Sequence, residues 1–239
     1  MKIVRCRITD IKDETYDVKT FRGVLSEGIE FVAGQYFLLR MPQVSVFETE
    51  WRPFTFSSSP TEKRFIEFTV KRMGEFTTAL HSLPKGSIVE IDGPRGEALN
   101  FNESVKDDVV FIAGGSGITP FISTIRFSVA KNLNNRITLI FSNRTYEDII
   151  YKDELYALNS NGRIKVVHTL TDSWPVGWDG ETGRINKHMI EKAVPRMQKN
   201  IWYVCGPPPM ISAVEAILHE LGIERDKIKI EEWQLPGKH

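Results

Sequence analysis

The sequence predicts a two-domain α+β protein, with an antiparallel β-barrel in its N-terminal half and a parallel sheet in its C-terminal half. The length, 239 residues, suits one large domain or two small ones. Up to about residue 97 short strand patterns alternate with turn residues, whereas after residue 108 apolar strands alternate with helices. We therefore place the domains at residues 1–106 and 107–239.

The N-terminal half contains short strand patterns separated by turn residues. Strands are expected at residues 4–8, 36–41, 65–71 and 88–91, with turn signals such as Lys85-Gly86 and Gly93-Pro94 between them. One short helix is expected at 77–83, and Pro84 ends it. This pattern is typical of a small antiparallel barrel with a capping helix.

The C-terminal half alternates apolar strands with helices. Strands are expected at 109–113, 137–141, 165–169 and 201–204, and helices at 120–132, 148–158, 186–194 and 211–221. Such alternation indicates a parallel sheet that is covered on both faces. A last short strand is expected at 228–230.

The composition excludes several classes of protein. Lys plus Arg and Asp plus Glu both count 31, so the net charge is zero, which argues against general binding to nucleic acid. Two cysteines and five scattered histidines cannot form a four-cysteine iron–sulfur or zinc site, so no metal centre is expected. The N-terminus does not resemble a signal peptide and no stretch is long enough to span a bilayer, which favours a cytoplasmic protein.

A glycine-rich turn follows the first strand of the C-terminal half. Residues 109–113 lead directly into Gly114-Gly115-Ser116-Gly117-Ile118-Thr119-Pro120, and a helix follows. Glycines allow a pyrophosphate to approach backbone N–H groups, and the helix N-terminus attracts the anion. The turn is neither a Walker A loop nor a complete Gly-x-Gly-x-x-Gly motif. A turn that binds nothing is the alternative, but its place at a strand's carboxyl end favours a nucleotide.

A second turn with unusual composition follows the strand at 201–204. It reads Cys205-Gly206-Pro207-Pro208-Pro209-Met210, and an amphipathic helix comes after it. The prolines favour a rigid turn, and Gly206 permits close approach of another group. The thiol of Cys205 would then lie at the carboxyl edge of the sheet, beside the glycine-rich turn. The alternative is that Cys205 is a small buried core residue.

Taken with three N-terminal motifs, these turns resemble the ferredoxin–NADP reductase family of flavoproteins. The N-terminal motifs are residues 51–58 (WRPFTFSS), 70–78 (VKRMGEFTT) and 93–96 (GPRG). All five motifs occur in order, and the resemblance covers residues 2–233. It implies a six-stranded barrel that binds FAD and a second domain that binds a nicotinamide nucleotide. FAD rather than FMN follows from the resemblance alone.

The resemblance implies a set of flavin-binding residues in the first domain. Arg52 would pair with the FAD pyrophosphate, Phe54 would lie against the isoalloxazine, where the family more often has tyrosine, and the Thr55 hydroxyl would lie near flavin N5. The remaining candidates are Pro53, Ser58, Val70, Lys71, Gly74, Phe76, Thr77 and Thr78.

Several of these residues have structural alternatives. Arg52 suits a surface ion pair, and either Phe54 or Phe56 suits the core because the two alternate along a strand. Thr77 suits the N-cap of the helix that it opens, a role compatible with binding the flavin phosphates.

The resemblance also implies the nucleotide-binding and catalytic residues of the second domain. Cys205 would lie against the nicotinamide, and Trp233 would cover the flavin, although six residues follow it and packing is its alternative role. Glu231 or Glu232 would influence flavin protonation. The other nucleotide-binding candidates are Gly115, Gly117, Thr119, Pro120, Ser142, Arg144, Gly206, Pro207 and Met210.

The choice between NADPH and NADH depends on the residues after the second parallel strand. No acidic residue stands at 142–145, so Ser142, Arg144 and Tyr151 are candidates to bind a 2′-phosphate, a slight preference for NADPH. A similar run occurs in family members that use NADH, and Arg144 has Glu147 or Asp148 as alternative partners.

The reaction that the resemblance implies is hydride transfer from NADPH or NADH to flavin N5, followed by electron transfer to a separate acceptor such as a ferredoxin, a flavodoxin or an oxygenase component. Three other functions stay open. They are an electron-transfer subunit of a larger complex, a reductase of free flavin or ferric chelates, and a regulatory module that has lost catalysis.

Overall fold

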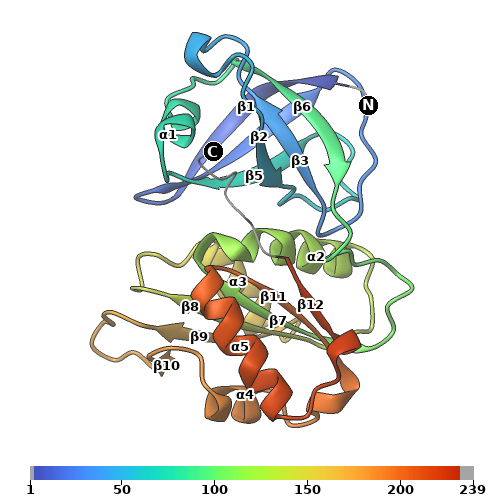
Figure 1. Ribbon diagram of the computed structural model, residues 1–239, viewed down its shortest axis with the longest axis vertical. Helices are drawn as coiled ribbons and strands as arrows, with labels where there is room; N and C mark the ends of the chain where they lie inside the picture. The colour runs from blue at the N-terminus through green and yellow to red at the C-terminus, as the bar shows by residue number, and fades with distance from the viewer. Residues whose placement is uncertain (1–2, 232–239) are drawn as a thin grey trace. The chain divides into compact units, whose positions relative to one another are not determined.

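The chain divides into two compact units in the computed structural model, which describes residues 3–231 (Figure 1). The first unit runs as far as Glu103 and also contains residues 119–133. The second comprises residues 104–118 and the chain from Asn134 onward. In the described residues, no helix has both the length and the apolar character needed to cross a bilayer.

The first unit is built on a six-stranded antiparallel sheet, as predicted. Its strand order is β4-β3-β6-β1-β2-β5. The bounds are Ile3–Thr15 for β1, Val18–Leu25 for β2, Tyr36–Arg40 for β3, Arg52–Thr55 for β4, Ile66–Lys71 for β5 and Ile88–Arg95 for β6. Strands β4 and β5 are the two edge strands of this sheet. An isolated bridge between Phe56 and Phe68 connects the segment after β4 with β5.

The core of the first unit consists of side chains that alternate along these strands. Phe21, Phe37 and Phe68 are fully buried, and Phe21 stacks on Phe68 with ring centroids 5.4 Å apart. Such aromatic pairs add to the stabilisation that comes from burial alone. The core therefore gives β2, β3 and β5 a fixed register.

The short helix of the first unit, α1, spans Glu75–His81 and starts earlier than predicted. Gly74 is its N-cap, so the alternative that Thr77 caps the helix is wrong. The Thr77 hydroxyl instead accepts a hydrogen bond from the Met73 N–H at 2.8 Å and donates to the Gly74 carbonyl at 3.1 Å. Thr77 thus stabilises the turn that precedes the helix.

The first unit also contains helix α2, Thr119–Ala130, which follows the glycine-rich turn in the sequence. The Ser123 hydroxyl donates to the Ser58 carbonyl at 2.7 Å. The guanidinium of Arg126 donates to the Ser57 carbonyl and to Glu67, both at 2.9 Å. These bonds attach α2 to the segment after β4 and to β5.

The second unit is built on a six-stranded parallel sheet with the order β10-β9-β8-β7-β11-β12. The strands span Asp108–Gly114 (β7), Ile137–Asn143 (β8), Lys165–Leu170 (β9), Glu181–Thr182 (β10), Asn200–Cys205 (β11) and Ile228–Ile230 (β12). Strand β7 lies between β8 and β11 in the sheet. The chain builds β8, β9 and β10 on one side of β7 and then crosses to build β11 and β12 on its other side. The carboxyl ends of β7 and β11 therefore flank a topological switch point, where open α/β sheets bind ligands.

Three helices cover the two faces of this sheet (Figure 1). Helices α4, Lys187–Ala193, and α5, Pro208–Glu220, pack on one face around the fully buried Trp202. Helix α3, Lys152–Ser160, lies on the other, where Tyr156 contacts His168 with ring centroids 5.5 Å apart.

The starts of two helices in the second unit also differ from the prediction, for identifiable reasons. Helix α3 begins at Lys152 and not at residue 148, because Tyr151 has the left-handed backbone conformation (φ 55°), which a helix cannot include. Helix α5 begins at Pro208 and not at 211. Pro208 and Pro209 lie in its first turn, where a missing N–H removes no intrahelical bond, so they start the helix and do not form a separate turn.

Candidate functional site

The two predicted turns of the second unit meet at the carboxyl edge of its sheet. Gly115–Ile118 forms a 3-10 helix directly after β7, and Cys205 is the last residue of the adjacent strand β11. A Cβ atom built on Gly117 would lie 2.3 Å from the Cys205 carbonyl oxygen and 2.8 Å from the Gly206 N atom. Only glycine permits this approach, so the two turns form one backbone surface.

The other glycines of this surface have different reasons to be glycine. Gly115 has a φ of 51°, and nothing lies within 4 Å of a Cβ built there, so its backbone conformation and not space requires glycine. A Cβ on Gly114 would meet the Met210 Sδ at 2.7 Å and the Pro207 Cδ at 2.9 Å. Open space above Gly115 and closely packed backbone beneath it suit the approach of a pyrophosphate.

The structure gives the remaining residues of these two turns mainly packing positions. Cys205 is 1% exposed, in no disulfide, and paired in register with Ala113. Met210 packs against Gly114 and Gly206. Thr119 and Pro120 are buried in the first turn of α2. The half-buried Gly115, Ser116, Gly206 and Met210 and the exposed Pro207 leave the backbone of this edge open to a ligand.

The neighbouring strand ends carry a charged pair that sequence reasoning missed. The guanidinium Nε of Arg144, which follows β8, donates to Asp172 Oδ2 at 2.7 Å, and the N–H of Asp172 donates to the Arg144 carbonyl at 2.9 Å. Glu147 and Asp148 were the expected partners of Arg144, and the ion pair with Asp172 was not expected. Asp148 accepts from the Thr145 N–H at 3.0 Å and from its hydroxyl at 3.1 Å. Ser142 is the half-buried partner of Gly114 in β7.

Asp172 is an acid that follows β9 and lies beside Arg144, which follows β8. The hydrogen bonds from Arg144 and from the Thr171 hydroxyl, at 2.9 Å, lower the pKa of Asp172 below its usual value. One signal was visible in the sequence: an acid stands two residues after the strand that ends at Leu170. Its pairing with Arg144, 28 residues away, depends on β8 and β9 being neighbours.

Glu231, a predicted catalytic residue, is the last residue that the structure describes. Burial raises the pKa of its carboxyl to about 7, and its Oε2 is buried without a hydrogen-bond partner among residues 3–231. A carboxyl with such a pKa exchanges protons near neutral pH. Trp233 and Glu232, the other candidates in this segment, lie outside the described residues.

The predicted flavin residues of the first unit occupy β4, the end of β5 and the start of α1. Phe54 is half buried and lies 6.3 Å from Phe76 with the ring planes inclined by 24°, whereas Phe56 is fully buried in the core. Of the two, Phe54 is therefore the side chain that is partly accessible. The Arg52 side chain is 37% exposed and pairs with Glu50, so the ion-pair alternative and a binding role are both compatible with its position. Pro53 is half buried in the same strand and Thr55 ends it, 6% exposed.

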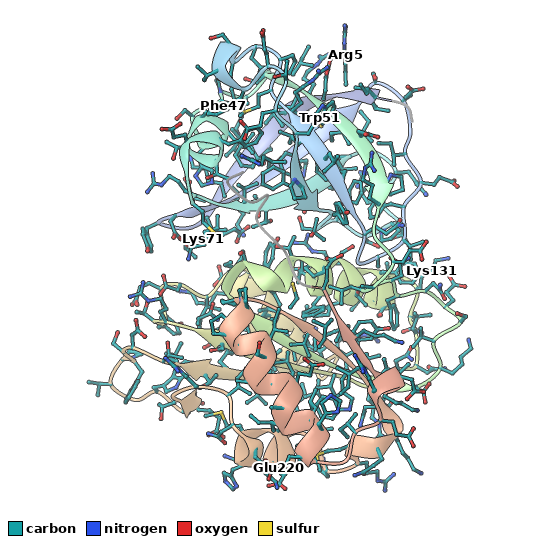
Figure 2. The ribbon with its side chains drawn as sticks, viewed as in Figure 1. Arg5, Phe47, Trp51, Lys71, Lys131 and Glu220 are labelled. Carbon is teal, nitrogen blue, oxygen red and sulfur yellow. The ribbon has the colours of Figure 1, made fainter. Side chains whose placement is uncertain are left out.

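The other flavin candidates make structural contacts. The Ser58 hydroxyl accepts from the Glu67 N–H at 3.0 Å. The Val70 carbonyl contacts the His81 Nε2 at 2.9 Å, and Lys71, labelled in Figure 2, pairs with Asp17 at 3.3 Å. A Cβ on Gly74 would meet nothing within 4 Å, and Thr78 beside it is exposed. The turn at Gly74 therefore has open space beside it, as the binding of phosphate oxygens expected there would require.

The residues of both units fit a dinucleotide flavin and a nicotinamide nucleotide, and nothing in the described part of the chain forms a metal site. No group of three or more His, Cys, Asp or Glu side chains in residues 3–231 is arranged to hold a metal ion.

Two family models match the chain. Residues 5–99 match the oxidoreductase FAD-binding domain, and residues 111–216 match the oxidoreductase NAD-binding domain. Together they cover both units.

Curated relatives are similar over nearly the whole chain. The glycine betaine monooxygenase reductase subunit of Pseudomonas aeruginosa is 32% identical over 94% of this chain and 62% of that protein. A probable dihydroorotate dehydrogenase B (NAD(+)) electron transfer subunit of Methanocaldococcus jannaschii is 30% identical over 93% of this chain and 76% of that protein. The chain thus spans about three fifths of the first of these relatives, 62% of its length.

Solved structures share the fold. The cytochrome b5 reductase domain of Ulva prolifera nitrate reductase superimposes with a TM-score of 0.83 at 25% identity, over 96% of this chain and 97% of that one. A ferredoxin NADP+ reductase from Neisseria gonorrhoeae, with bound FAD and NADP, gives 0.82 at 23% identity, over 97% and 98% of the two chains. With the paired domain models and the glycine surface at the switch point, these matches show that the chain belongs to the ferredoxin–NADP reductase-like family of FAD- and NAD(P)-binding oxidoreductases.

Proposed function

We propose that this protein is an NADH-dependent flavoprotein reductase that passes electrons to a separate protein acceptor. The observation that carries the proposal is the backbone surface of Gly115, Gly117 and Gly206 at the switch point, which suits a dinucleotide pyrophosphate. FAD, when bound, supplies the chemistry of accepting a hydride and releasing single electrons. The residues of the chain supply binding and orientation.

The proposed roles of individual residues follow from their positions. Arg52 exchanges its pairing with Glu50 for the flavin pyrophosphate, since a guanidinium binds phosphate oxygens with two parallel hydrogen bonds. Phe54 presents its partly accessible ring to the isoalloxazine, and the turn at Gly74 holds phosphate oxygens. Glu231 holds or releases a proton near neutral pH because burial raises its pKa to about 7.

The Arg144–Asp172 pair supports NADH as the nucleotide, although Arg144 alone favoured NADPH. Asp172 neutralises the guanidinium and presents an ionised carboxylate, which accepts hydrogen bonds from free ribose hydroxyls and repels a 2′-phosphate. The relative from Methanocaldococcus jannaschii carries NAD(+) in its name, which agrees with this assignment.

The acceptor is proposed to be an oxygenase component or another redox protein. The Pseudomonas aeruginosa relative is named as the reductase subunit of a monooxygenase, which supports an oxygenase. The Methanocaldococcus jannaschii relative is named as an electron transfer subunit, and it supports the second candidate, a subunit of a larger complex. Stoichiometric co-purification with a second polypeptide would favour that candidate, and turnover by the isolated chain with added acceptor proteins would favour the first.

The experiment that tests the reductase is an anaerobic titration of the protein, reconstituted with FAD, with NADH and in parallel with NADPH. Loss of the flavin absorbance near ~450 nm, at lower concentrations of NADH than of NADPH, is the expected result. Intact absorbance with both nucleotides would overturn the function but leave flavin binding in place.

A pair of variants tests the nucleotide assignment. Asp172→Ala removes the repulsive carboxylate and the ion pair that neutralises Arg144, so KM for NADPH is expected to fall by about tenfold, which corresponds to ~1.4 kcal/mol. Asp153→Ala removes an exposed acid from the first turn of α3 and serves as the matched control. An unchanged NADPH KM in Asp172→Ala would contradict the role of Asp172 without affecting the titration result.

A further inference from the structure

The loop between β9 and β10, residues 171–180, carries an exposed tryptophan that the proposed function does not use. The loop contains two tryptophans. The indole N–H of Trp178 donates to the Glu181 carbonyl at 3.0 Å, and its ring lies 6.0 Å from that of Tyr146. Trp174 is 52% exposed, and within residues 3–231 its ring stacks on no other. The fold therefore uses one of the two indoles and leaves the other open to a ligand.

Trp174 has an ordered backbone although its side chain is exposed. Before it, the N–H groups of residues 172–173 both donate to the Arg144 carbonyl, at 2.9 and 3.3 Å. After it, the Trp178 N–H donates to the Pro175 carbonyl at 3.1 Å and closes a turn. Because hydrogen bonds hold the chain on both sides of Trp174, little backbone freedom is lost when a ligand binds there.

The order of the strands brings Trp174 into line with the proposed nucleotide site. The glycine turn follows β7, Arg144 follows β8, and both Asp172 and Trp174 follow β9. These three strands are neighbours in the sheet. Neighbouring strands lie ~5 Å apart, so the ends of β7 and β9 are separated by roughly 10 Å. A nucleotide with its pyrophosphate after β7 and its ribose at Asp172 would therefore bring its base next to Trp174.

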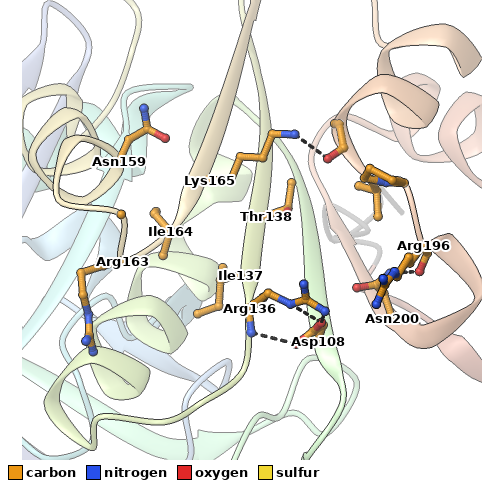
Figure 3. Close-up of a pocket in the computed structure, with 14 residues that line it drawn as sticks. Asp108, Arg136, Ile137, Thr138, Asn159, Arg163, Ile164, Lys165, Arg196 and Asn200 are labelled. Atoms are coloured by element: carbon orange, nitrogen blue, oxygen red, sulfur yellow. Dashed lines mark hydrogen bonds and ion pairs between the residues drawn. The ribbon is translucent and has the colours of Figure 1, made fainter.

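The amino edge of the same sheet differs from this arrangement, as Figure 3 shows. The side chains that line the pocket there serve the fold. Arg136 donates to Asp108 through its Nε at 2.8 Å, and Lys165 donates to the Ala193 carbonyl at 2.7 Å. The exposed indole of Trp174, in contrast, lies at the carboxyl edge, where open α/β sheets bind their ligands.

We propose that Trp174 stacks on the adenine of the bound nicotinamide dinucleotide and so forms the adenine subsite of this chain. The inference rests on the proposed function, which assigns the pyrophosphate to the glycine surface and the ribose to Asp172. An indole binds the flat face of a base without contacting a 2′-phosphate. Trp174 therefore supplies affinity for NADH and NADPH alike, whereas Asp172 supplies the choice between them.

Two fragments of the dinucleotide test the subsite in the protein reconstituted with FAD. ADP-ribose keeps the adenine and lacks the nicotinamide, whereas reduced nicotinamide mononucleotide keeps the nicotinamide and lacks the adenine. In Trp174→Ala the Kd for ADP-ribose, measured by calorimetry, and KM for NADH, with ferricyanide as the electron acceptor, are both expected to rise about tenfold, as the loss of one base–aromatic stack predicts. KM for reduced nicotinamide mononucleotide should not change.

Two further variants make the test specific. Trp174→Phe keeps an aromatic ring and should keep most of the affinity for ADP-ribose. Val176→Ala removes another exposed apolar side chain from the same loop and should leave the Kd for ADP-ribose unchanged.

Two results would overturn the proposal. One is an unchanged Kd for ADP-ribose in Trp174→Ala, which would leave the exposed indole to a protein partner. The other is an equal rise in KM for NADH and for reduced nicotinamide mononucleotide. Calorimetry with ADP-ribose does not depend on flavin reduction. A protein that binds ADP-ribose through Trp174 and is not reduced by NADH would therefore overturn the proposed function alone.

Discussion

At the scale of single residues, two glycines of the same turn are required for different physical reasons. Gly117 has no room for a Cβ because the Cys205 carbonyl would lie 2.3 Å away, whereas Gly115 has room but a φ of 51°. A Cβ at residue 117 would collide with backbone and so force the two turns apart. A Cβ at residue 115 would collide with nothing and would only strain the left-handed backbone of that one residue.

Gly117→Ala is therefore expected to impair the nucleotide site more than Gly115→Ala. In Gly117→Ala the turns move apart, so the free energy of unfolding should fall by about 2–3 kcal/mol and KM for NADH should rise. In Gly115→Ala a loss of about 1–2 kcal/mol is expected from the left-handed backbone alone. Urea unfolding and steady-state kinetics of both variants check this order, and equal losses would contradict it.

His168 is a buried titratable residue outside the proposed chemistry. It is 7% exposed, its ring lies 6.0 Å from Phe141 and 5.5 Å from Tyr156, and neither ring nitrogen has a hydrogen-bond partner in residues 3–231. Burial lowers its pKa to about 4. The folded protein therefore holds His168 neutral where the unfolded chain takes up a proton.

This pKa predicts a loss of stability in acid. The loss begins as the pH falls below about 6.5, the unfolded pKa, and is complete near pH 4, amounting to roughly 3 kcal/mol at most. In His168→Phe that part of the pH dependence should be absent, and in His188→Gln, an exposed control, it should persist. Urea midpoints measured between pH 7 and pH 4 distinguish the two, and identical profiles for His168→Phe and the unmodified protein would refute the assignment.

At the scale of elements, helix α2 is held to the first unit by a charged cluster around Glu67. The Glu67 side chain is 12% exposed. Its Oε1 accepts two hydrogen bonds from Arg22, at 3.0 and 2.8 Å, and its Oε2 accepts one from Arg126 at 2.9 Å. Because Arg126 belongs to α2 and Arg22 to β2, one carboxylate connects a helix and two strands.

Glu67→Gln is expected to destabilise the protein by about 2–3 kcal/mol, since it leaves two guanidinium groups without their shared, mostly buried partner. The control is Glu62→Gln, which removes an ion pair with Arg64, whose side chain is 83% exposed, and should change little. Thermal unfolding of both variants gives the comparison. A loss in Glu62→Gln as large as in Glu67→Gln would show that the cluster has no special role.

The elements that the sequence predicted well are those with a clear hydrophobic pattern or with a proline just beyond their end. Strands β7, β8 and β11 are apolar runs, and Pro84 lies just beyond α1. Strand β2 was missed because Lys19, Arg22 and Gly23 interrupt its alternation, although each is held by cross-strand pairing. The glycine surface was predictable from local motifs, whereas Asp172 was not, because its contact with Arg144 exists only through the pairing of β8 with β9.

At the scale of the whole molecule, the compact units are not consecutive segments of chain. The chain passes from the first unit to the second after Glu103, returns for residues 119–133, and leaves again at Asn134. The predicted domain boundary at residues 106 and 107 separates the barrel from α2, whose Ser123 and Arg126 bind the segment after β4. Each compact unit is therefore built from two separate segments of the chain.

A fragment of residues 1–106 should accordingly be much less stable than the barrel within the full chain. It loses the hydrogen bonds of Ser123 and Arg126 to Ser58 and Ser57, and the edge contact of Phe127 with Phe101 at 6.4 Å. The Ser57 and Ser58 carbonyls then bind water in place of their donors, so each lost hydrogen bond costs about 0.5–1.5 kcal/mol. A full chain that unfolds in one cooperative transition, beside a fragment that melts at lower temperature or stays unfolded, is the expected result by circular dichroism. A fragment that melts with the full chain would mean that α2 contributes nothing to the barrel, and that the boundary read from the sequence is also the boundary of the folding unit.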